Sequence, residues 1–88
     1  MNSSDFIDAC EEKLLPMTPV ISSVIDKQLR DMGQSRDMLS PKQAEMLIRR
    51  VVEALKLFIG PSGAEAAKSV MMKELRKRAP DYFTAQGL

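Results

Sequence analysis

The side chains in this sequence that could do chemistry are carboxylates, lysines, arginines and one thiol. Asp5 and Asp8 stand three residues apart, Glu11 and Glu12 follow them closely, and Cys10 lies between the two pairs. Paired carboxylates can act as general acid and base when burial moves one pKa toward neutrality. The 88-residue chain has no histidine, which excludes Cys-His and Ser-His catalysis and zinc sites of the Cys/His type. We therefore predict no enzymatic activity, no cofactor and no metal.

Structural roles explain the same charged residues more simply. Asp5 and Asp8 fall in the first turns of a predicted helix, where carboxylates interact favourably with the helix dipole. Glu45, Arg49 and Glu53 recur every four residues, which is typical of a solvated helix face. These spacings favour helix stabilisation over catalysis.

The composition indicates a single soluble domain spanning residues 1–88. Thirteen basic and 12 acidic residues give a net charge of +1, which provides no whole-chain attraction for nucleic acid. No apolar run approaches the roughly 18 residues needed to span a bilayer. The first residues lack the basic start and long apolar middle of a signal peptide. Together with the lone cysteine, these features predict a cytoplasmic protein without a membrane span.

An all-α bundle is predicted because proline and glycine divide the chain into helical lengths without strand-like alternation. The clearest helix start is Ser40, which can cap free amides with Pro41 in the first turn and Gln43 completing a capping box. Apolar residues then recur at helical spacing until Gly60. The pattern predicts a central helix over about 41–59 that contacts more than one neighbour. Its expected core residues are Ala44, Leu47, Ile48, Val51, Val52, Leu55, Phe58 and Ile59.

Another helix is predicted over about 63–79, after the central one. Ser62 and Glu65 form a second capping-box pattern, and Pro80 should end the helix. Residues 81–88 then form a tail that docks through Tyr82 and Phe83.

The first third of the chain supports two interpretations. In one, Ser3 or Ser4 caps a short helix over about 4–15, and Thr18 before Pro19 starts a long helix over about 19–32 that Gly33 closes. In the other, these residues form one helix kinked at Pro16 to Pro19, and the sequence does not decide between them. The preferred bundle thus has three long helices and a short N-terminal one.

The outward face of the central helix is the predicted partner-binding surface. Met46, Arg50 and Leu57 project opposite the apolar stripe, and Met72 projects from the polar side of the next helix. Methionine adapts well to interfaces, so this face favours a homodimer. Scattered exposed apolar residues are also normal on monomers, which is the alternative explanation.

An uneven charge distribution keeps a nucleic-acid-binding alternative open. Residues 1–33 carry six acids and three bases, whereas residues 63–79 carry five bases and two acids. The candidate nucleic-acid-binding residues in that basic segment are Lys68, Lys73, Arg76 and Lys77. Basic residues in a last turn also complement the helix dipole, and the N-terminal end of this helix is rich in alanine rather than in base-reading side chains.

The stretch from Ala54 to Pro61, followed by an Ala- and Lys-rich helix, resembles a short helical segment near the ends of some bacterial signalling proteins. The resemblance covers under a third of the chain and implies a regulatory role. We predict a non-catalytic protein-protein interaction or assembly module, with nucleic-acid binding through residues 63–79 as the alternative.

Overall fold

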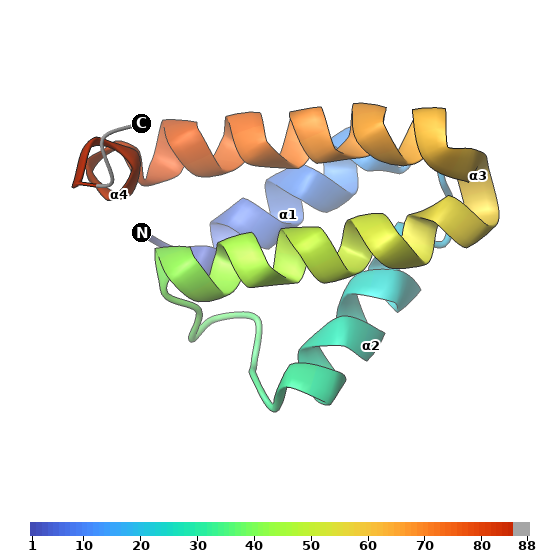
Figure 1. Ribbon diagram of the computed structural model, residues 1–88. Helices are drawn as coiled ribbons and strands as arrows, with labels where there is room; N and C mark the ends of the chain where they lie inside the picture. Colours follow the sequence, from blue (N-terminus) through green and yellow to red (C-terminus); the bar gives the residue numbers. More distant parts are fainter. Residues whose placement is uncertain (86–88) are drawn as a thin grey trace.

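Four helices follow one another in a computed structural model that describes residues 1–85. They are α1 (Ser3–Leu14), α2 (Ile21–Met32), α3 (Pro41–Arg78) and α4 (Pro80–Ala85). The long α3 turns back on itself, α1 packs against it from behind, and α2 lies against its first half (Figure 1). No strand occurs in residues 1–85, so the predicted all-α class is confirmed. Within this range no helix combines the length and apolar composition needed to cross a bilayer.

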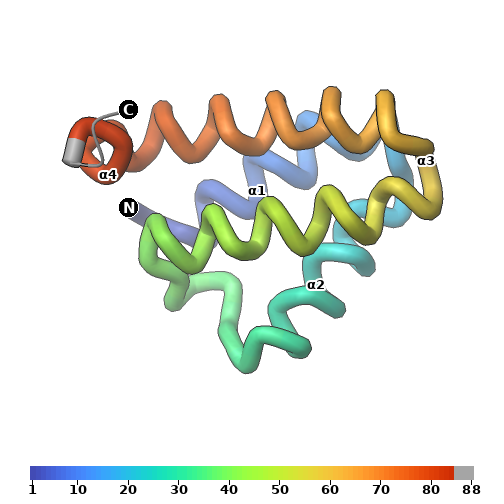
Figure 2. The backbone as a smooth tube through the Cα atoms, viewed as in Figure 1, coloured from blue at the N-terminus to red at the C-terminus, as the bar shows by residue number. Residues whose placement is uncertain are grey.

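The two helices predicted over 41–59 and 63–79 correspond to the two halves of α3, which are joined through a kink at Gly60. The 38-residue α3 has a single non-helical residue, Gly60, with φ 76° and ψ 171°. This backbone conformation is open essentially only to glycine. Pro61 follows and suits the first position of the returning stretch. We call residues 41–59 the first limb and residues 61–78 the second limb; the two run antiparallel (Figure 2).

The start of α3 confirms the predicted capping box. The Ser40 hydroxyl accepts from the Gln43 backbone N–H at 3.2 Å, and the Gln43 side chain accepts from the Ser40 N–H at 2.9 Å. The predicted box at Ser62 has no counterpart, because the second limb already begins at Pro61 and Ser62 lies inside the helix. A capping side chain comes from the residue just before the first helical one, and that position is held here by Gly60, which has no side chain.

Most of the predicted stripe on the first limb forms the core. Its buried members are Ala44, Leu47, Ile48, Val51, Val52 and Leu55. Ile59 is half-buried and packs against this core. Phe58 is 60% exposed, so the prediction that it anchors the core is wrong. It lies near the end of the first limb and lines an open groove beside α2 with Val20 and Val24.

Helix α1 starts one residue earlier than predicted and uses a different cap. The Asn2 side chain accepts from the Asp5 N–H at 3.1 Å, so the predicted cap by Ser3 or Ser4 is wrong. Ser3 is buried instead; its hydroxyl donates to the Arg36 carbonyl at 2.8 Å and accepts from the Leu39 N–H at 3.1 Å. The Ser3 hydroxyl therefore bonds to the α2–α3 connection and does not cap the helix.

Helices α1 and α2 are separate, which rules out the single kinked helix. The predicted start of α2 at Pro19 is wrong: the helix begins at Ile21, and its cap residue Val20 makes no side-chain cap hydrogen bond. Thr18 is buried, and its carbonyl accepts from the Ile21 N–H at 3.1 Å. Gly33 closes α2 as predicted, with φ 67°.

Pro80 ends α3 as predicted, but part of the expected tail is the short helix α4. Phe83 is buried and Tyr82 is half-buried, which confirms docking through this pair. The Tyr82 hydroxyl donates to Glu45 at 2.8 Å, and the Arg76 guanidinium lies 5.4 Å from the Phe83 ring centre. The last three residues of the predicted tail, 86–88, lie outside the described residues.

Candidate interaction surface

Four exposed side chains form a line along the first limb, directly opposite its buried stripe. We call them the outer strip: Met46, Arg50, Glu53 and Leu57. At about 100° per residue they fall within an arc of about 60° on the helix. Leu57 is 87% exposed and Met46 is 48% exposed. Sequence reasoning had assigned Glu53 to a solvated ladder and missed it here, although its spacing from Arg50 and Leu57 places it on the same line.

Shallow hollows border the outer strip. A wide, open hollow of about 470 Å³ lies between the first limb and α2 and is lined by Gln28, Arg49, Arg50, Glu53 and Ala54. An apolar hollow of about 260 Å³ with Phe58 at its edge continues this groove along α2. On the other side, a polar hollow of about 200 Å³ lies between the two limbs of α3. Arg50 and Glu53 thus line the first hollow, and Glu53 also lines the third.

The two charges of the outer strip stay accessible despite local contacts. The Arg50 Nε donates to the Gln28 side chain at 3.2 Å. Lys56 donates to one carboxylate oxygen of Glu53 at 2.8 Å, which raises the pKa of Lys56. The Glu53 side chain is still 71% exposed. A carboxylate of a partner can reach Arg50, and a basic side chain of a partner can reach Glu53.

The structure does not bring Met72 to the outer strip. Met72 is half-buried on the second limb, where it lines a separate hollow of about 420 Å³ with Lys68, Lys73 and Arg76. Lys77 does not line that hollow, and it lies close enough to Glu74 to lower the pKa of that carboxyl. The predicted partner-binding residues are thus split between two surfaces, whereas three of the four predicted nucleic-acid-binding residues line one hollow.

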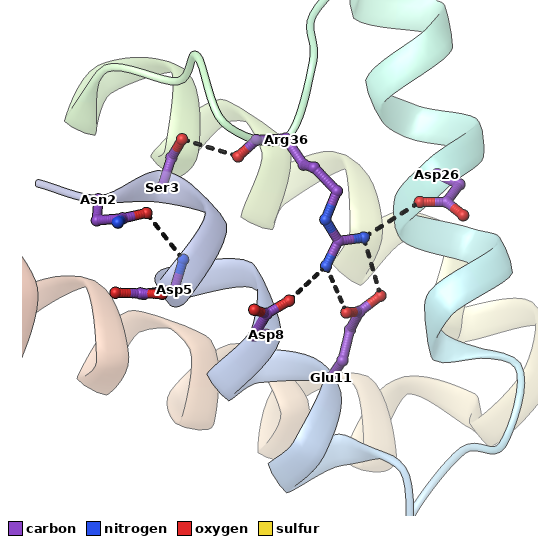
Figure 3. Close-up of polar contacts among 7 residues, drawn as sticks. All are labelled: Asn2, Ser3, Asp5, Asp8, Glu11, Asp26 and Arg36. Atoms are coloured by element: carbon purple, nitrogen blue, oxygen red, sulfur yellow. Dashed lines mark hydrogen bonds and ion pairs between the residues drawn. The ribbon is translucent and has the colours of Figure 1, made fainter.

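Two of the acidic residues near the N-terminus, Asp8 and Glu11, pair with Arg36, which lies in the connection between α2 and α3 (Figure 3). The Arg36 guanidinium donates to Glu11 at 2.7 Å and to Asp8 at 2.8 Å, and lies 3.6 Å from Asp26 of α2. The hydrogen bond to Glu11, followed by the one to Asp8, raises the pKa of Arg36. The cluster links the connection to both α1 and α2, so Asp8 and Glu11 have a structural use.

A second ion cluster lies at the interface of α1 with the second limb. Glu74 is only 2% exposed and pairs with Lys13 and, at 3.4 Å, with Arg78. The Lys13 hydrogen bond lowers the pKa of Glu74, outweighing the effect of burial. Nearby, burial followed by the charge of Glu74 raises the pKa of the Cys10 thiol to about 12. The thiol therefore stays protonated and is a poor nucleophile.

The Lys13–Glu74 pair predicts a pH-dependent contribution to stability. Because folding lowers the pKa of Glu74, the pair stabilises the fold at pH values above the ordinary carboxyl pKa of 4.5. This stabilisation is lost as the pH falls through the lower pKa of Glu74 in the folded state. We expect Lys13→Met to cost about 1 kcal/mol at pH 7, discounted because Lys13 is half-exposed. Urea unfolding should show the deficit shrinking at pH 3, whereas Lys73→Met should cost nothing at either pH. A deficit that persists unchanged at pH 3 would contradict this assignment.

Comparisons with known proteins leave the function open. The chain matches no family model, and no characterised protein or solved structure shows significant similarity to it. Within residues 1–85, no group of three or more Cys, Asp or Glu side chains is arranged to hold a metal ion. The surfaces described above are thus the basis for a functional proposal.

Proposed function

We propose that this protein is a non-catalytic protein-protein interaction or assembly module with a regulatory role, and that the outer strip is its contact surface. The observation that carries the proposal is the 87% exposure of Leu57 on a helix whose opposite face is the centre of the core. Burying one leucine side chain is worth roughly 1.5 to 3 kcal/mol. A partner that covers this strip gains that free energy.

The chemistry of the remaining reactive groups supports a non-catalytic role. Cys10 is buried with its pKa raised, Glu74 is held ionised by Lys13, and Arg36 pairs with Glu11 and Asp8. Catalytic carboxylates and thiols need the opposite arrangement, with a pKa near neutrality and access to substrate. A lone reduced thiol also supports a cytoplasmic setting.

The proposal is tested by pull-down from the native cell with the variants Met46→Glu and Leu57→Glu. A charge placed in an apolar contact should remove bound partners. Met38→Glu and Leu15→Glu are matched controls, because these residues are 71% and 53% exposed and lie off the outer strip. Partners lost from the first two variants and kept by the controls support the proposal. Retention of every partner by both strip variants would exclude this surface.

A second candidate, nucleic-acid binding, is favoured by one arrangement. Lys68, Lys73 and Arg76 of the second limb line one hollow. Arg49 and Lys56 of the first limb lie across the groove between the limbs, which Lys68 also lines. Phosphate contacts from such a surface would make affinity fall steeply with added salt. Lys73→Glu should weaken RNA or DNA binding in this case, but an interaction module acting through the outer strip should keep its protein partner.

A further inference from the structure

The order of side chains along the outer strip is apolar, basic, acidic, apolar. Met46, Arg50, Glu53 and Leu57 are separated by four, three and four residues, the spacing of a coiled-coil seam. Seams with this spacing pair with another helix of matching pattern; their positions are usually apolar, and a polar residue in the seam or charges beside it set the register and orientation. The order of apolar and charged residues in the strip therefore restricts which helix can pair with it and in which direction.

We propose that the outer strip binds a second copy of this chain, with the two first limbs antiparallel. The two-fold axis passes through the strip midway between Arg50 and Glu53. This inference rests on the proposed function and names the partner. In this register Met46 faces Leu57 of the second copy, and Arg50 faces Glu53. The two-fold axis repeats each contact, so both charge pairs and both apolar pairs form at once.

Charge complementarity selects this arrangement over a parallel one. In a parallel pair in register, Arg50 would face Arg50 and Glu53 would face Glu53, and like charges opposed at an interface are unfavourable. Antiparallel pairing turns both contacts into opposite-charge pairs. The Glu53 carboxylate is 71% exposed and Arg50 is also exposed, so both can turn toward a second copy.

The grooves beside the strip fit the same geometry. Helices pack by placing the ridge of one into the groove of the other. The hollow of about 470 Å³ between the first limb and α2 directly borders Arg50 and Glu53, and Phe58 extends the apolar surface beyond it. Arg49 and Lys56, beside the strip, have acidic neighbours in their own chain, at 3.9 Å from Glu45 and 2.8 Å from Glu53. These pairs reduce repulsion between the basic flanks of two copies.

Charge exchange tests the register. Arg50→Glu makes the middle of the strip wholly acidic, and Glu53→Arg makes it wholly basic, so each variant should repel its own copy. Sedimentation velocity on the full chain over a concentration series should show self-association weakened at least tenfold in each single variant. The double variant carrying both changes should recover to within about threefold of the original affinity. An equimolar mixture of the two single variants should also form dimers.

Arg30→Glu and Glu12→Arg are the matched controls, since both residues are exposed on other helices and both variants should dimerise normally. Circular dichroism should show unchanged helicity in every variant. Single variants that dimerise as tightly as the original chain, or a double variant that fails to recover, would overturn the register. A single-chain mass at all concentrations would overturn self-pairing, and loss of a cellular partner from Leu57→Glu would then still support the proposed function.

Discussion

Leu55→Ala should lower the free energy of unfolding by about 2 to 5 kcal/mol, the usual cost of removing a large buried side chain. Leu55 is fully buried in the core stripe of the first limb, which both α1 and α2 contact. Truncation leaves a cavity that the surrounding helices fill only in part. Urea unfolding followed by circular dichroism measures the change, and a lower midpoint with an unchanged slope would attribute it to the native core.

Leu57→Ala is the matched control for this prediction. The residue type and the helix are the same, but Leu57 is 87% exposed. Its truncation should change the unfolding free energy by no more than about 0.5 kcal/mol when measured on the single chain at low concentration. Equal losses in the two variants would show that the first limb is rotated from its described orientation.

Gly60→Ala should cost about 1 to 3 kcal/mol because the bend of α3 depends on a backbone conformation that alanine rarely adopts. Gly60 has φ 76° and ψ 171°, and a Cβ added there would meet no atom within 4 Å. The cost is therefore conformational and not steric crowding with the rest of the fold. Thermal and urea unfolding of the variant should both report the loss.

Ser62→Ala separates this effect from general disturbance of the bend. Ser62 is exposed and helical, so alanine fits its conformation and should change stability by no more than about 0.5 kcal/mol. A Gly60→Ala variant as stable as the Ser62→Ala variant would mean that the two limbs meet through a different turn.

Several features set by neighbouring residues were predictable from the sequence. The Ser40 capping box, the Gly33 helix end and the stop before Pro80 each depend on a few adjacent residues, and each was predicted correctly. The buried stripe of the first limb was also largely predictable, because helical spacing puts apolar residues on one face wherever that face is covered.

Features set by distant contacts were not predictable. Ser3 has the sequence of a helix cap, but its hydroxyl is used by Arg36 and Leu39, over 30 residues away. Phe58 continues the apolar stripe, but the arrangement of α2 leaves it uncovered. Helical periodicity specifies a face and not whether another helix extends far enough to cover it.

The candidate surface shows the same division. The exposure of Met46, Arg50 and Leu57 followed from their position opposite the stripe. The separation of Met72 from them follows from the antiparallel return of the second limb and needed the structure. The spacing of Glu53 from Arg50 and Leu57 was enough to predict that it lies in the outer strip. Its spacing from Glu45 and Arg49, however, suggested an ordinary solvated ladder.

Because Cys10 is buried, the reactivity of its thiol reports how often the helices of this protein separate transiently. The sulfur lies against the junction of α1 with α3, 1% exposed, and burial raises its pKa to about 12. Disulfide reagents attack a thiolate that they can reach, so labelling requires the helices to part. The labelling rate of this one atom therefore counts transient openings of the bundle, without any added dye or tag.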